Sequence, residues 1–136
     1  MNTENNELRD YLVWETIFGV CPSKSNNYEL SGFDSNGFRH MFKSERMRQY
    51  EKSFAAQCHI YKDRMISRPF IFHLIAYYPS NVYDLDGGFK GILDCMQYNR
   101  CIKDDNLVRK IVAEKRLDPQ NPRIMFAIQE LEPTLF

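Results

Sequence analysis

Carboxylates are concentrated in one stretch of the sequence, YDLDGGFKGILDCMQYNRCIKDDNLV, which runs from Tyr83 to Val108. Asp84 and Asp86 are one residue apart, so in an extended chain their side chains point to the same side and can bind one hard cation. Carboxylate oxygens are ligands that suit Mg²⁺ or Mn²⁺. The residues of this stretch that could take part in such chemistry are Asp84, Asp86, Lys90, Asp94, Asp104 and Asp105.

A helix is expected directly after the first two aspartates. From Asp86 onward the apolar residues follow a helical period, with positions i, i+3, i+4 and i+7 occupied by Phe89, Ile92, Leu93 and Met96. This pattern predicts an amphipathic helix that begins near Asp86. Asp86 is a residue type that caps helix N-termini, and it is expected to do so here.

Lys90 shares a second face of this helix with Asp86 and Asp94, because the three residues are four positions apart. Gly87 and Gly88 occupy the first turn, where each costs up to roughly 1 kcal/mol relative to alanine. Close approach of a phosphate to the N–H groups at the helix start would explain why bare backbone is needed there.

A third carboxylate follows the helix. Residues 100–103 turn the chain, and Asp104 and Asp105 precede the β-branched segment LVRKIVAEKRL. This segment predicts a strand over about 106–116. The chain can therefore bring a further carboxylate back to Asp84 and Asp86.

Each of these residues also has a purely structural interpretation. Asp84 and Asp86 could be a turn residue and a helix cap, and Asp104 a turn residue. Lys90 could be a solvated lysine paired with Asp94 on the helix surface. Taken one at a time these roles are the simpler ones, but the agreement of several spacings favours a site.

The remaining sequence predicts an α+β fold. We expect a single domain over residues 1–136, with residues 1–10 flexible and a mixed sheet of about four strands on which two main helices pack. A long loop should cover 21–37, and the last two strands should be antiparallel neighbours. The expected strands are 12–20, 69–79, 106–116 and 123–131, and the expected first helix is 44–64, capped by Ser44.

Composition limits the class of protein. The chain has 136 residues, of which 43% are hydrophobic, enough for a core. No apolar run reaches the length of a membrane span, and the N-terminus MNTENNELRD lacks the features of a signal peptide, so we expect a soluble cytoplasmic protein. The four cysteines form no C-x-x-C pair and the three histidines are scattered, which argues against zinc and for buried thiols.

The formal net charge is zero, which by itself argues against nucleic-acid binding. The charge is unevenly distributed, however, with seven bases and three acids in 41–70 and seven bases and four acids in 99–123. These segments could grip phosphates around an acidic centre, although charge counts alone favour ordinary solvated faces. The candidate DNA contacts are Lys24, Lys43, Arg46, Lys52, Arg100 and Lys103.

The segment DLDGGFKGILD followed by KDDNLV resembles the signature of the RusA-like endodeoxyribonucleases, Holliday junction resolvases common in prophages. The pattern of that family is D-x-D-N-x-x-K-x-x-x-D and then D-D-x-x-V. PSKSNNYE, near the N-terminus, is similar to the proline, serine and asparagine loop of the family. The resemblance runs in order from about Trp14 to Glu130 and implies a RusA-like fold.

The resemblance also implies roles for individual residues. Asp84, Asp86 and Asp105 correspond to metal-binding and catalytic carboxylates, and Lys90 corresponds to a catalytic lysine. Asp94 and Asp104 match secondary acidic positions. The implied metal is Mg²⁺, with Mn²⁺ as a possible substitute. One departure concerns the residue after the second aspartate, which is asparagine in the family and Gly87 here.

The implied function is that of a metal-dependent, structure-specific endodeoxyribonuclease. A homodimer of this kind resolves a four-way DNA junction by paired nicks, in recombination and repair, and a prophage origin fits the family. In the implied mechanism a metal-activated water attacks a phosphodiester in line, and Lys90 helps to stabilise the transition state.

Two other functions stay open. Gly87 could mark a decayed metal site in a non-catalytic module that binds DNA junctions. The acidic cluster could also serve a Mg²⁺-dependent phosphotransferase acting on nucleotides. Against this second alternative stands the absence of a GxxxxGK[ST] loop, although other phosphate sites exist.

Overall fold

The computed structural model describes residues 11–23 and 28–132. The predicted flexible segment 1–10 and the proposed DNA contact Lys24 lie outside the described residues. In chain order the strands and α-helices are β1 (Glu15–Phe18), β2 (Tyr28–Leu30), β3 (Met41–Lys43), α2 (Glu45–Gln57), β4 (Phe70–Tyr78), α3 (Phe89–Tyr98), β5 (Val108–Leu117) and β6 (Arg123–Glu130). Two short 3₁₀ helices, η2 (Asp86–Gly88) and η3 (Asp105–Leu107), precede α3 and β5.

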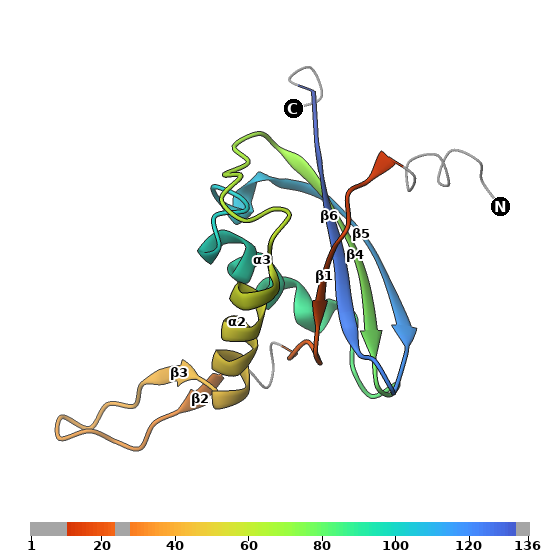
Figure 1. Ribbon diagram of the computed structural model, residues 1–136. Coiled ribbons are helices and arrows are strands. Elements are labelled where there is room, and N and C mark those ends of the chain that lie inside the picture. The colour runs from red at the N-terminus through yellow and green to blue at the C-terminus, as the bar shows by residue number, and fades with distance from the viewer. Residues whose placement is uncertain (1–10, 24–27, 133–136) are drawn as a thin grey trace.

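The main sheet has four strands in the order β1-β6-β4-β5. Strand β4 pairs in parallel with β5 and antiparallel with β6, which in turn pairs antiparallel with β1. Figure 1 shows α2 and α3 on the same side of this sheet. The predicted α+β fold, a mixed four-stranded sheet with two helices packed on it, is confirmed.

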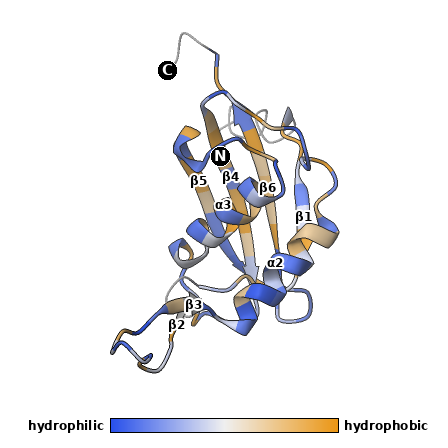
Figure 2. Ribbon diagram, turned by 90° about the vertical axis from the view of Figure 1, so that its left-hand side faces the viewer, coloured by the Kyte–Doolittle hydropathy of each residue, from blue (hydrophilic) through white to orange (hydrophobic). Residues whose placement is uncertain are grey.

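Large apolar side chains fill the space between the helices and the sheet. Phe54 of α2 stacks on Phe126 of β6, with ring centroids 5.7 Å apart, and both are fully buried. Ile92 and Met96 of α3 are buried as completely. The hydropathy colouring of Figure 2 shows the apolar character of the central strands beneath these helices. The apolar period that predicted α3 therefore marks its core face.

The expected pairing of the last two strands is wrong. β5 and β6 run in opposite directions, but β4 lies between them. Asp118, just after β5, donates its backbone N–H to the carbonyl of Tyr78 at 2.8 Å, so the connecting turn crosses the end of β4. The alternative order would leave apolar β4 at an edge, whereas β5 carries several charged residues and suits an edge position.

Helix α2 is shorter than predicted. Ser44 caps it as expected, since its Oγ accepts the N–H of Met47 at 3.2 Å. The helix ends at Gln57 rather than near residue 64, although the apolar spacing continues through Cys58 and Tyr61, both of which are buried. Something other than local periodicity therefore ends this helix.

That constraint is a buried carboxylate on β1. Oε1 of Glu15 accepts backbone N–H groups from His59, Ile60 and Tyr61 at 3.0, 2.7 and 3.2 Å, and the thiol of Cys58 at 3.3 Å. Glu15 is 4% exposed. Three consecutive N–H groups that would otherwise continue the helix are thus turned toward one oxygen, and the helix stops.

A small hairpin was not predicted. The expected loop 21–37 contains β2, which pairs antiparallel with β3. The hairpin extends away from the main sheet in Figure 1. Its strands are three residues long, too short for an alternating pattern to identify them.

The prediction that the cysteines are buried thiols is confirmed, because all four cysteines are free and buried.

Among the described residues, no helix is both long enough and apolar enough to span a membrane.

Replacing the buried carboxylate tests its role. Glu15→Ala leaves three N–H groups without their acceptor, and we expect it to lower the free energy of unfolding by roughly 2–4 kcal/mol. Urea denaturation of the full chain measures this change. Glu130→Ala, at an exposed position of β6, is the matched control and should stay within about 0.5 kcal/mol of the parent. Equal stability of the two variants would show that Glu15 does not hold α2 to the sheet.

Candidate active site

Two stacked tyrosines position the start of the site. Tyr78 ends β4, and its ring lies parallel to that of Tyr83, with centroids 4.9 Å apart and planes inclined by 3°. Lys115 of β5 donates from Nζ to the carbonyl oxygen of Tyr83 at 3.0 Å. The backbone is therefore fixed to the sheet one residue before Asp84.

Asp84 and Asp86 follow on the surface, where both are exposed. The carbonyl of Asp84 accepts the N–H of Gly87 at 3.3 Å and forms the turn into η2. The expected capping role of Asp86 is wrong, because Leu85 and Gly88 occupy the N-cap positions of η2 and α3 and Asp86 is the first residue of η2. A short 3₁₀ turn precedes the α-helix, so the cap position moves along the chain.

The structure explains Gly88 differently from the expected phosphate contact. A Cβ on this buried residue would lie 3.0 Å from Sγ of Cys21 and 3.3 Å from the hydroxyl of Tyr78. Gly88 therefore lets the helix start approach the end of β4 closely.

Lys90 is the centre of the charged cluster. Its Nζ lies 2.6 Å from Oδ2 of Asp105 and 3.0 Å from Oδ1 of Asp94. Asp94 is one turn further along α3, whereas Asp105 comes from η3, where its N–H donates to Oε1 of Gln97 at 3.2 Å. The sequence-predicted lysine and two of the predicted carboxylates are thus brought together.

These contacts shift the pKa values of the cluster. The hydrogen bond to Asp105, followed by that to Asp94, raises the pKa of Lys90, while the same Lys90 contact lowers the pKa of Asp105. Half of the Lys90 side chain is exposed, so solvent screens the pairs. Lys90 is accordingly a fixed positive charge at neutral pH.

Asp104 is a turn residue, as in the structural interpretation of the sequence. It is the N-cap of η3, and its Oδ1 accepts the N–H of Asn106 at 3.0 Å. This contact sets the direction of the chain at Asp105 and so helps to place that carboxylate beside Lys90.

Asp84 and Asp86 are not joined to this cluster. Within residues 11–23 and 28–132, neither side chain forms an ion pair or hydrogen bond with Lys90, Asp94 or Asp105, and no three histidine, cysteine or acidic side chains are grouped so as to hold a metal ion. The donors suit a hard cation in type, since Asp84 and Asp86 are exposed carboxylates. Asp105 would have to supply a ligand oxygen while its Oδ2 stays paired with Lys90.

The proposed DNA contacts are spread over the surface. Arg46 and Lys103 are exposed. Arg100 has a positive φ of 59° and lies 3.8 Å from the carboxylate of Asp63. Lys43 and Lys52 differ from these residues, because both line one pocket.

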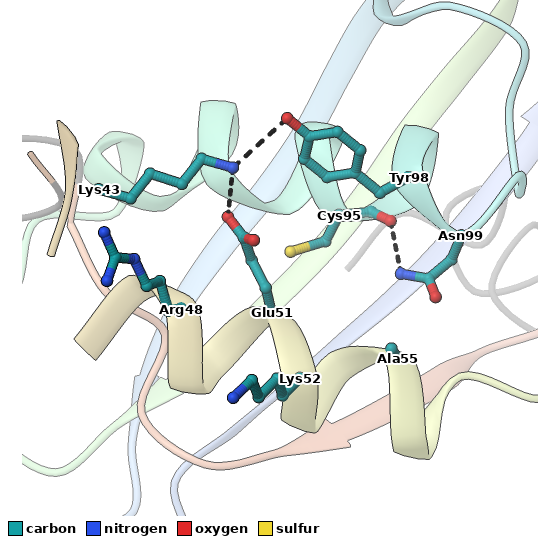
Figure 3. A pocket seen from close by; sticks show the side chains of 8 residues that line it. All are labelled: Lys43, Arg48, Glu51, Lys52, Ala55, Cys95, Tyr98 and Asn99. Atoms are coloured by element: carbon teal, nitrogen blue, oxygen red, sulfur yellow. Dashed lines mark hydrogen bonds and ion pairs between the residues drawn. The ribbon is translucent and has the colours of Figure 1, made fainter. Parts of the chain in front are cut away.

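That pocket was not predicted from the sequence. It has a volume of about 630 Å³ and lies between α2 and α3 (Figure 3). One wall of the pocket comes from a single face of α2, with Arg48, Glu51, Lys52 and Ala55. Their spacing of three and four residues is visible in the sequence and could have indicated this shared face. Its eight lining residues are Lys43, Arg48, Glu51, Lys52, Ala55, Cys95, Tyr98 and Asn99.

Together these features define a small α+β protein with an aspartate and lysine site at the start of α3. The family model for endodeoxyribonuclease RusA matches residues 22–129, a range that contains this site and most of the sheet. The chain therefore belongs to the RusA endodeoxyribonuclease family, and the resemblance inferred from the sequence is confirmed. No curated protein matches the chain.

The Lys90 cluster makes a pH-dependent prediction. Because the folded pKa of Asp105 is lowered, its pairing stabilises the fold above the unfolded value of about 3.9 and loses that effect as pH falls through the folded pKa. Lys90→Met should raise the pH at the midpoint of the Asp105 titration. NMR of the side-chain carboxyl groups measures this midpoint. Asp118, whose pKa is lowered by Arg123, should titrate unchanged in the variant. An unmoved Asp105 midpoint would show that Lys90 does not stabilise this carboxylate.

Proposed function

We propose that this protein is a metal-dependent, structure-specific endonuclease that resolves four-way DNA junctions by paired nicks in recombination and repair. The observation that carries the proposal is the Lys90 ammonium group held between Asp94 and Asp105 on the helix that begins directly after Asp84 and Asp86. Family membership supports endodeoxyribonuclease activity.

The residues divide the chemical work. Asp84, Asp86 and Asp105 would hold Mg²⁺, or Mn²⁺ in its place, which supplies an activated water and charge stabilisation when bound. Lys90 presents a positive charge toward the phosphate, where negative charge develops in the transition state. Asp94 orients Lys90 from one helical turn away, and Asp104 orients Asp105 through the η3 turn.

A homodimer is part of the proposal. A four-way junction has to be cut on two strands, and two copies related by a twofold axis supply two equivalent sites. A cytoplasmic location and a prophage origin remain predictions from the sequence and its family.

A non-catalytic junction-binding module is the second candidate. It is favoured by the separation of Asp84 and Asp86 from the Lys90 cluster among the described residues, and by Gly87 in the position of the family's asparagine. The two candidates differ in one observable, the metal-dependent breakage of a phosphodiester.

The wild-type protein should nick a synthetic four-way junction in Mg²⁺ or Mn²⁺ and not in a chelator. A flap and a linear duplex of the same sequence are the control substrates, and both should be cut more slowly. Tight junction binding without nicking in either metal would favour the non-catalytic module instead.

Asp86→Asn tests the assignment of the exposed aspartate pair. We expect junction binding to persist and the cleavage rate to fall by roughly 100-fold or more, because a charged ligand is lost without a change in shape. Glu130→Gln is the matched control and should cut at the parent rate. Full cleavage by Asp86→Asn would refute its role as a ligand.

A further inference from the structure

The pocket between α2 and α3 has the composition of a nucleotide site. Three cationic side chains, Lys43, Arg48 and Lys52, line it together with one carboxylate, Glu51. Its volume of about 630 Å³ lies in the range of pockets that bind small ligands. In Figure 3 the α2 side chains lie on one side of the pocket and Tyr98 of α3 lies on the other.

Lys43 connects the two walls. Its Nζ lies 2.7 Å from Oε1 of Glu51, 3.4 Å from the hydroxyl of Tyr98 and 4.7 Å from the centroid of the Tyr98 ring. The hydrogen bond with Glu51 is the main cause of a raised pKa for Lys43, so its ammonium persists and neutralises that carboxylate. Arg48, which also lies 3.9 Å from Oε2 of Glu45, and Lys52 add two further cations to a lining whose one carboxylate is Glu51. This composition favours an anion.

Tyr98 supplies an aromatic surface. The residue is 66% exposed even though it belongs to α3, whose other large apolar side chains are mostly buried. Nδ2 of Asn99 donates to the carbonyl of Cys95 at 2.8 Å, which leaves its amide oxygen as the acceptor for a ligand. An exposed ring beside several cations is the combination that binds single-stranded nucleic acid, because bases stack on the ring and phosphates meet the cations.

The pocket and the proposed active site share one helix. Lys90, Asp94 and Tyr98 are spaced by four residues on α3, so they follow one face. Lys90 and Tyr98 are therefore roughly 12 Å apart along the helix axis. This separation corresponds to a few nucleotides of one DNA strand, at about 3.4 Å each in a duplex and more when the strand is stretched.

We propose that this pocket binds an unpaired nucleotide of the DNA strand that is cut at the Lys90 site, with its base on Tyr98 and its phosphate at Arg48 and Lys52. The part concerning the cut strand rests on the proposed function. The pocket thereby selects substrates whose strand can leave the duplex near the cut, as strands do at a branch point.

Binding of a short single-stranded oligonucleotide containing 2-aminopurine tests the pocket without any cleavage. The wild-type protein should bind it and quench the fluorescence of a stacked base. Tyr98→Ala should weaken binding roughly tenfold and abolish the quenching, whereas Tyr98→Phe, which keeps the ring, should retain both. Lys52→Gln should weaken binding and reduce its salt dependence. Lys62→Gln, at an exposed position outside the pocket, is the control and should bind as the parent does.

A second arm places 2-aminopurine at successive positions around the cut in a four-way junction. Quenching confined to positions a few nucleotides from the cut, and lost in Tyr98→Ala, supports the proposal. Unchanged oligonucleotide binding and quenching in Tyr98→Ala would overturn it, even if wild-type cleavage is normal. Equal affinity for free dAMP and for the oligonucleotide would also overturn it, because the site would then bind mononucleotides. Absence of junction cleavage by the wild type would refute the proposed function alone, since the oligonucleotide arm does not depend on cleavage.

Discussion

One carboxylate oxygen determines how α2 meets the sheet. Oε1 of Glu15 accepts three consecutive N–H groups just beyond the helix and the thiol of Cys58. A buried carboxylate is costly unless its hydrogen bonds are made, so β1 and the end of α2 must stay together. Because β1 pairs with β6, and β6 with β4, the position of α2 is tied to the strand that leads to the aspartates. The α2 wall of the cationic pocket depends on the same contact.

The charged cluster determines how η3 is placed against α3. Lys90 bridges Asp94 of its own helix and Asp105 of η3, and Gln97 binds the backbone of Asp105. Two contacts from α3 therefore fix the segment that leads into β5. Exposed ion pairs contribute little to stability, so the main effect of this cluster is to place a positive charge. The two carboxylates keep Lys90 in its protonated form.

Local signals predicted much of the fold. The period of Phe89, Ile92 and Met96 identified the core face of α3, and the Ser44 cap identified the start of α2, because each depends on neighbours in the chain. The end of α2 could not be predicted, since it depends on Glu15, more than forty residues away in sequence. The order of β5 and β6 in the sheet could not be predicted either. It depends on which strand is apolar enough to lie between two others, and this is a property of the whole sheet.

The candidate site was predictable to a similar degree. The spacing of Lys90 and Asp94 followed from helix geometry, and the structure pairs these two. The turn after α3 brings Asp105 to Lys90, whereas the sequence led us to expect it beside Asp84 and Asp86. The capping role of Asp86 failed because a 3₁₀ turn precedes α3, and periodicity does not resolve such a turn. The pocket could not be predicted, because its walls come from two helices whose relative placement depends on the packing of the core.

A single rigid helix therefore sets the distance between the two regions that contact DNA in our proposals. The apolar face of α3 is buried against the sheet, so Lys90 and Tyr98 cannot move independently along the helix. A strand held at Tyr98 is then constrained in which of its phosphates can reach Lys90. Substrate choice in this arrangement follows from how far the strand can leave its duplex, and it requires no contact with a base edge.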